Sequence, residues 1–212
     1  MAAIAAKLEE DIIFGRLYPR ERLIEEELMQ HFGIKRHVVR DVLATLERMG
    51  LVERRKNIGA LVRSFTTKEV AELYAVRALL ETEAARLIPL PIHEASFGRL
   101  VAIQEQHDEA VQASNPPRVF RANQAFHQAL FELTGNETLQ RAITEYARQT
   151  HPIRFSALVA ANYRERARSE HWRMIDALRA GDRETLVALF AEHILPSRDA
   201  YLAAHADHFK PI

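Results

Sequence analysis

Cysteine is absent from this chain of 212 residues, and glycine and proline are scarce, at seven and eight residues. The lack of cysteine excludes disulfide bonds, thiolate metal ligands and cysteine nucleophiles. No apolar run approaches the ~18 residues that a membrane-spanning helix needs. The opening residues, MAAIAAKLEED, turn acidic before a signal peptide can develop. We therefore expect a cytoplasmic protein that does not enter a membrane.

Net charge is also missing, because 29 basic and 29 acidic residues cancel. The balance is nevertheless uneven along the chain. Residues 1–32 hold four basic and seven acidic residues, a net charge of −3, whereas residues 33–63 hold eight basic and three acidic residues, a net charge of +5. A basic segment in a neutral chain indicates a local surface for an anionic partner, not a general affinity for polyanions.

The first third of the chain has the periodicity of three helices followed by a hairpin. Helices are predicted over about residues 2–14, over a segment that carries Ile24 and Leu28 and stops at Gly33, and over about residues 36–49. The third helix has an apolar stripe made of Val39, Val42, Leu43, Leu46 and Met49. The segment LVERRKNIGALV then places two short apolar runs around a polar tip, which predicts a β-hairpin. This order is that of a winged helix-turn-helix domain, here residues 1–65.

Residues 66–212 are predicted to form a second, all-helical domain, which makes the fold mainly α. The motif TTKE at residues 66–69 is a capping box that starts a new helix. Breaks are expected near IPLPIHE, SNPPR, TGNE, THPIR and AGDRE, and Gly135 is expected to close one helix before Asn136 caps the next. We predict a bundle of six or seven helices in this domain.

The basic segment has the chemistry of a surface that reads DNA. Arg36 and Arg40 lie one turn apart, opposite the apolar stripe, with Lys35 and His37 beside them at the start of the helix. Arginine pairs with O6 and N7 of guanine in the major groove, and a helix N-terminus adds amide donors for phosphate. The hairpin tip adds three basic residues that can reach phosphates or the minor groove: Arg54, Arg55 and Lys56. A basic cluster alone is typical of a solvated face, but its place on a helix-turn-helix with a basic wing favours double-stranded DNA.

The same stretch resembles the DNA-binding domain of the GntR family of bacterial transcription regulators. The matching positions are Gly15, Pro19, Leu23, Glu25, Leu28, Gly33, Arg36, Val39, Arg40, Leu43, Leu46, Gly50, Leu51, Val52 and Gly59. The chain departs from the family pattern at Arg20, Ile24, Lys35, Val38 and Ile58. The resemblance implies that the start of the third helix and the wing, including Gly59, contact DNA. Because Lys35 departs from the family pattern and His37 occupies a position that can touch bases, no operator sequence follows from it.

The second domain resembles the all-helical FCD-type effector domain of the FadR-like branch of that family. The resemblance lies in LYAVRALLETEAARL, in NQAFHQALFELTGNETL and in EHWRMIDALRAGD with EHI. It implies a divalent metal such as zinc or nickel, held by His127, His171, His193 and the residue at position 123, where the family has aspartate and this chain has Asn123. Imidazoles suit such ions, and open coordination positions accept a carboxylate effector. Because the amide of Asn123 carries no charge, weaker affinity or a different metal is expected.

The remaining residues of interest are expected at ordinary positions in the core or at the surface. Arg77 is a candidate partner for an effector carboxylate, with a surface ion pair to Glu81 as the alternative. Trp172 is expected in the core. The histidines without a matching context are expected at the surface: His31, His93, His107, His205 and His208.

Three functions follow from these features. The favoured one is a homodimeric transcription regulator, not an enzyme, that reads a pseudo-palindromic operator through residues 1–65. A small organic acid bound in residues 66–212 would control it, and repression released by this effector is expected from the resemblance alone. The second is a metal-dependent enzyme built on His127, His171 and His193, but the chain lacks the H-E-x-x-H motif, paired E-x-x-H motifs and an evident general base. The third is a helical adaptor whose basic helix binds an acidic protein.

Overall fold

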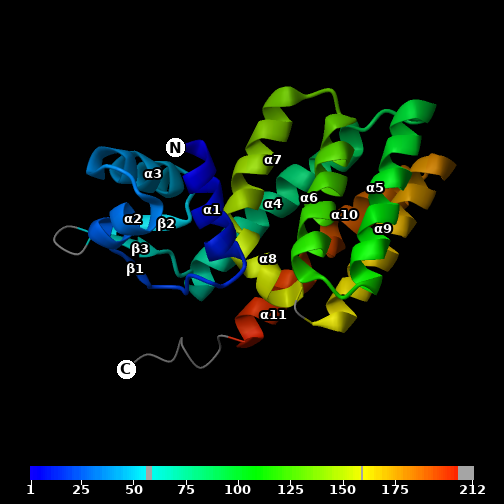
Figure 1. Cartoon of the computed structure of the whole chain (residues 1–212). Coiled ribbons are helices and arrows are strands. Elements are labelled where there is room, and N and C mark those ends of the chain that lie inside the picture. Colours follow the sequence, from blue (N-terminus) through cyan, green and yellow to red (C-terminus); the bar gives the residue numbers. More distant parts are fainter. Residues whose placement is uncertain (56–58, 159, 205–212) are drawn as a thin grey trace. The chain divides into compact units, whose positions relative to one another are not determined.

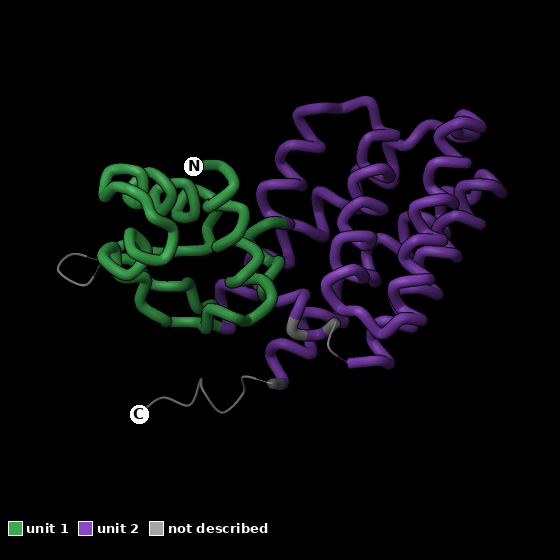
Figure 2. The backbone as a smooth tube through the Cα atoms, viewed as in Figure 1, with its two compact units in different colours: residues 1–66, 148–152 green, residues 67–147, 153–212 purple. Residues whose placement is uncertain are grey.

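The computed structural model describes residues 1–55, 59–158 and 160–204. They divide into two compact units, which Figure 2 shows in different colours. Unit 1 comprises Met1–Thr66 with Arg148–Pro152, and unit 2 comprises Thr67–Ala147 with the chain from Ile153 onward. No helix in these described segments is both long enough and apolar enough to cross a membrane.

Unit 1 is a winged helix-turn-helix with a small antiparallel sheet (Figure 1). Its elements are α1 (Ala2–Ile13), β1 (Arg22–Leu23), α2 (Glu25–Phe32), α3 (Arg36–Arg48), β2 (Val52–Arg55) and β3 (Gly59–Val62). The predicted hairpin is β2 with β3, but the sheet has a third strand, because β1 pairs with the other side of β3. A strand of two residues is too short to show a period of two, so the sequence gives no sign of it.

The core of unit 1 forms where the apolar stripe of α3 meets α1 and the sheet. Four of the five predicted stripe residues are buried, and Met49 is partly buried and packs against them. Their buried neighbours from the other elements are Ala5, Leu8, Ile12, Leu23, Leu51, Val52, Ala60 and Val62. Gly33 ends α2 with a left-handed φ of 63°, as its role of helix stop predicts. The stripe faces inward, so the opposite face of α3, with its arginines, is left in solvent.

Unit 2 is all-helical, as predicted, but has more helices than expected. They are α4 (Thr67–Leu87), α5 (Glu94–Gln112), α6 (Pro116–Glu132), α7 (Glu137–Gln149), α8 (His151–Leu158), α9 (Ala161–Ala180), α10 (Arg183–His193) and α11 (Leu195–Ala204). The prediction of six or seven is therefore wrong, since eight lie in the described part of the chain. Breaks were missed between α8 and α9 and at Ile194. Neither contains glycine, and Pro196 lies in the first turn of α11, where proline is tolerated.

The helices that carry the candidate ligands pack around one apolar core. Phe126, Leu130, Met174 and Phe190 are its large buried members from α6, α9 and α10. Helix α5 packs on both α6 and α9, and α10 packs on both α4 and α9. The predicted break at TGNE is confirmed, because Asn136 caps α7 by accepting a hydrogen bond from the Leu139 amide at 3.0 Å. The arrangement sets side chains from several helices side by side in the interior of unit 2.

Candidate functional site

The predicted DNA-contacting residues of unit 1 lie together around the start of α3 and the wing. Arg36 and Arg40 are about half exposed, at 50% and 59% of their side-chain area, and Lys35 and His37 are also exposed. The wing contributes Arg54 and Arg55 from β2 and Gly59, which starts β3 with a φ of 99°. Lys56 lies outside the described residues. A groove of about 330 Å³ is bordered by Arg40 and by these three wing residues.

Acidic residues of α2 hold the arginines of α3 in place. Arg36 Nη2 lies 2.5 Å from Glu26 Oε1, and Arg40 Nε lies 3.1 Å from Glu25 Oε1. Exposed pairs of this kind stabilise a fold by only about 0–1 kcal/mol, so a phosphate or base edge can replace the carboxylates at little cost. Arg54 Nη2 also donates to the Arg40 carbonyl at 2.7 Å, which ties the wing to α3.

One residue of this groove was missed by the sequence analysis. Arg22 in β1 borders the same groove as Arg40 and Gly59. It comes next to the wing only because β1 pairs with β3, where Arg22 lies opposite Leu61. No local sequence signal marks this pairing.

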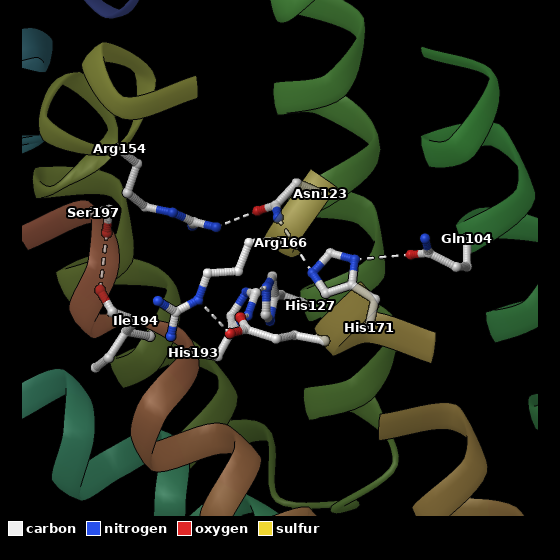
Figure 3. Close-up of polar contacts among 10 residues, drawn as sticks. Gln104, Asn123, His127, Arg154, Arg166, His171, His193, Ile194 and Ser197 are labelled. Atoms are coloured by element: carbon white, nitrogen blue, oxygen red, sulfur yellow. Dashed lines mark hydrogen bonds and ion pairs between the residues drawn. The ribbon is translucent and has the colours of Figure 1, made fainter. Parts of the chain in front are cut away.

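In unit 2, the three predicted histidines converge in the interior (Figure 3). His127 lies on α6, His171 on α9 and His193 at the end of α10, and they are 8%, 0% and 7% exposed. One ring nitrogen of each lies within 4.8 Å of the others, and the Nε2 atoms of His127 and His193 are 3.0 Å apart. Three imidazoles from three helices thus share one buried point.

Outer partners orient two of these rings. His193 Nδ1 lies 2.7 Å from Glu170 Oε2, and His171 Nδ1 lies 2.8 Å from Gln104 Oε1. The Gln104 amide nitrogen donates to Asp108 Oδ1 at 2.7 Å, so its oxygen faces the ring and His171 Nδ1 carries the proton. The Nε2 lone pair of His171 therefore points into the cluster. A carboxylate or amide acceptor behind each imidazole is the usual arrangement around a metal site.

The electrostatics of the cluster keep His127 and His171 neutral. Burial, and next the nearby His193, hold the pKa of both rings well below the ordinary histidine value. Burial would raise the pKa of the Glu170 carboxyl, but hydrogen bonds and charges from His193 and Arg166 bring it below its ordinary value. The buried Nδ1 of His127 has no hydrogen-bond partner in the described part of the chain. Neutral imidazoles with inward lone pairs fit a divalent metal such as zinc or nickel.

The fourth predicted ligand has a different environment. Asn123 on α6 is 3% exposed, and its Nδ2 lies 3.3 Å from His171 Nε2. Its Oδ1, the amide atom suited to a metal, accepts a hydrogen bond from Arg154 of α8. The three histidines therefore fit a metal, whereas Asn123 is already bonded on both sides.

Several expectations for unit 2 are corrected by burial. Arg77 does pair with Glu81, at 2.7 Å, but the pair is buried and not at the surface, with both residues 2% exposed. His107 was predicted at the surface and is fully buried, because α5 packs on α6 and α9; burial lowers its pKa to about 4. His31 and His93 are exposed as predicted, and His205 and His208 lie outside the described residues.

The sequence analysis missed the outer partners Gln104, Glu170 and Arg154. Glu170 precedes His171 directly, which is a weak signal, but its partner is His193 on another helix. Trp172, expected in the core, is partly buried and packs against it, and its Nε1 donates to Asp108 at 2.9 Å. These contacts depend on how helices pack, which spacing along one helix does not reveal.

Comparisons with known proteins agree with both halves of this description. Residues 1–62 match bacterial regulatory proteins of the gntR family, and residues 72–195 match the FCD domain. The chain is 26% identical to YdhC of Bacillus subtilis, an uncharacterized HTH-type transcriptional regulator, over 97% of this chain and 89% of that one. It is 28% identical to the probable D-xylose utilization operon transcriptional repressor of Paenarthrobacter nicotinovorans, over 92% and 84% of the two chains.

Two solved structures share the fold. A GntR transcriptional regulator from Rhodococcus sp. RHA1, described as putative in its title, superposes with a TM-score of 0.82 at 22% identity, over 96% of this chain and 97% of that one. McbR/YncC of E. coli superposes with a TM-score of 0.79 at 19% identity, over 99% and 98%. The family consists of transcription regulators, so the enzyme alternative finds no support. The chain belongs to the GntR family of bacterial transcription regulators, with a winged helix-turn-helix followed by an FCD domain.

Proposed function

We propose that this regulator is a cytoplasmic, homodimeric repressor whose affinity for a pseudo-palindromic operator is controlled by a small organic acid. Residues 1–65 bind DNA, and residues 66–212 bind the effector and dimerise. The observation that carries the proposal is the presence of two separate sites in one chain. Unit 1 exposes Arg36 and Arg40 at the start of its recognition helix, and unit 2 buries three convergent imidazoles.

The DNA-binding half rests on charge and exposure. Arg36 and Arg40 can contact base edges in the major groove, while Lys35, His37 and the wing arginines contact phosphates. Two copies related by a two-fold axis would present two recognition helices to half-sites about one helical turn apart. Arg22 is added to the predicted set because it borders the same groove.

The effector-binding half rests on the donor set in unit 2. His127, His171 and His193 would hold the metal, and Glu170 and Gln104 orient two of them. When bound, a divalent ion supplies a Lewis-acidic centre for a carboxylate. Effector binding then shifts the population between states that bind DNA and states that do not, by the difference in its affinity for the two.

DNA binding is tested by its dependence on salt. A duplex selected by the protein from a random library, titrated by fluorescence anisotropy, is expected to lose affinity steeply as KCl rises. A dimer that neutralises six to ten phosphates loses about 10³–10⁵ in affinity between 50 and 200 mM salt. A shuffled duplex is the control and should bind more weakly at every salt concentration. Failure to select any duplex, or affinity that ignores salt, contradicts the proposal.

Metal binding is tested by metal content. Protein purified without a histidine tag or chelator is expected to carry about one divalent ion per chain, because neutral imidazoles with fixed tautomers are pre-arranged ligands. His171→Ala should lose the ion, and the exposed His31→Ala should keep it. Metal is measured by inductively coupled plasma mass spectrometry. No metal in wild type would mean that the imidazoles are satisfied by one another and by Asn123.

A further inference from the structure

The arginines around the histidine cluster of unit 2 differ in how their charge is balanced. Arg77 is buried and has Glu81 at 2.7 Å, whereas Arg166 is about half exposed and has Glu170 at 2.7 Å. Arg154 on α8 is 9% exposed, and its hydrogen bond goes to the neutral amide oxygen of Asn123. Across the described residues, no carboxylate lies within ion-pair distance of Arg154. This guanidinium is therefore a buried charge with no ion-pair partner of its own among the described residues, although the carboxylate of Glu81, which pairs with Arg77, raises its pKa.

An uncompensated buried cation is expensive, and a guanidinium does not escape by losing its proton. Burial, and next the neighbouring Arg77, lower the pKa of Arg154, so its surroundings disfavour a second positive charge there. Five N–H groups need acceptors, and one amide oxygen satisfies a single donor. An anion that reached Arg154 would supply an ion-pair partner and could accept two of these N–H bonds.

A one-way chain of hydrogen bonds fixes the orientation of Asn123. Arg154 donates to Asn123 Oδ1, and Asn123 Nδ2, 3.3 Å from His171 Nε2, donates to the lone pair of that nitrogen. His171 Nδ1 donates to Gln104 Oε1 at 2.8 Å (Figure 3), and Gln104 donates to Asp108 at 2.7 Å. Each group donates to the next, so the Asn123 amide cannot turn over without breaking two bonds. Its oxygen is held toward Arg154.

An aspartate at position 123 would change this balance. One of its oxygens would form an ion pair with Arg154 and cancel its charge. The other would face the lone pair of His171 Nε2, a repulsive contact unless a proton or a cation lies between them. The amide of Asn123 has neither effect. Its N–H donates to His171 Nε2, and its uncharged oxygen gives Arg154 no ion-pair partner. The chain's departure from the family's aspartate therefore makes the site more favourable for an anion and less favourable for a cation.

We propose that Arg154 is the anchor for the carboxylate group of the effector, and that Asn123 positions Arg154 instead of ligating a metal. The inference rests on the proposed function and adds to it the anchoring residue and the charge of the ligand. A carboxylate accepts two parallel N–H bonds from one guanidinium, and its single charge balances a single arginine. Arg154 donates to Asn123, whose amide nitrogen lies 3.3 Å from His171 Nε2, so a group anchored on Arg154 lies near the imidazoles.

The test uses full-length protein stripped of metal by a chelator, with acetate, lactate and malonate as probes and inorganic phosphate for comparison. Affinities are measured by calorimetry and by the shift in Tm. At least one carboxylate should bind wild type better than phosphate. Arg154→Gln should lose about 10- to 100-fold in that affinity, the loss typical of charge-assisted hydrogen bonds. Arg166→Gln, which removes a cation already paired with Glu170, should bind within about threefold of wild type.

Asn123→Asp gives a second, isosteric variant with two opposite expectations. Its affinity for carboxylates should fall, as in Arg154→Gln, because the new aspartate neutralises the charge of Arg154. Its affinity for Zn²⁺, measured separately by calorimetry, should rise above that of wild type, because a charged oxygen now faces the imidazoles. Should Arg154→Gln fail to fold, Asn123→Asp carries the test alone.

Two results overturn the inference. One is that none of the three carboxylates binds wild type, and the other is that Arg166→Gln loses binding while Arg154→Gln keeps it. Salt-dependent binding of the selected duplex is measured on the same preparations. If duplex binding persists while the carboxylate results fail, the inference alone is wrong. If duplex binding is absent while the carboxylate results hold, the proposed DNA-binding function is wrong and the anion site stands.

Discussion

Replacing Glu81 by alanine is expected to lower the free energy of unfolding by about 3–5 kcal/mol, the usual cost of removing one partner from a buried ion pair. Burial lowers the pKa of Arg77, but the carboxylate of Glu81, and next Tyr74, more than restore it, so Glu81 is the main counter-charge of Arg77. Without Glu81, Arg77 would lie buried near Arg154, a second cation that the charge of Glu81 also stabilises. Urea unfolding followed by circular dichroism measures the loss.

A neighbouring pair on the same helix supplies the control. Glu83 pairs with Arg86 at 3.2 Å, but both side chains are about half exposed, at 51% and 56%. Glu83→Ala should therefore cost no more than about 1 kcal/mol. A double variant, Arg77→Met with Glu81→Leu, should recover most of the stability lost by Glu81→Ala, since apolar residues of similar volume replace buried pairs well. Equal losses in Glu81→Ala and Glu83→Ala would contradict the description of a buried pair.

The helical part of the fold was predictable because each signal is local. The α3 stripe repeats at helical spacing, and Gly33 and Asn136 end and cap helices through groups within four residues of themselves. The strand β1 escaped prediction because its only support is pairing with β3, about forty residues later. The break between α10 and α11 was missed because Pro196 lies in the first turn of α11 and so does not mark the end of α10. The break between α8 and α9 was missed because no glycine marks it. Local sequence signals thus predicted where helices end better than which elements pair with one another.

The candidate ligand site was predictable only in its histidines, and only through a family resemblance. Nothing in the spacing of His127, His171 and His193 shows that their three helices meet. The partners that decide the chemistry of the site come from helix packing: Gln104 from α5, Arg154 from α8, and Glu170 of α9, which bonds His193 of α10. His107 illustrates the same limit, because it was expected at the surface but its helix α5 packs on both α6 and α9. Charge balance in an interior is a property of the assembled helices.

Removing both recognition-helix arginines, by Arg36→Ala with Arg40→Ala, is expected to weaken binding of the selected duplex by about 2–6 kcal/mol, since each such contact contributes about 1–3 kcal/mol. Both side chains are exposed, and their ion pairs with Glu25 and Glu26 contribute little to stability. The Tm should therefore stay near that of wild type while DNA affinity collapses. Anisotropy titrations at a fixed, moderate salt concentration measure the change.

Unit 1 also offers a control that removes the same charge from a different place. Lys7 and Arg16 both pair with Asp11 and are about half exposed, at 50% and 48%. The double variant Lys7→Ala with Arg16→Ala therefore also deletes two cations that have acidic neighbours. If general attraction to polyanions drove binding, the two double variants would lose affinity equally. If the start of α3 reads the operator, only the Arg36 and Arg40 variant loses its preference for the selected duplex over the shuffled one, because base contacts carry sequence information and diffuse charge does not.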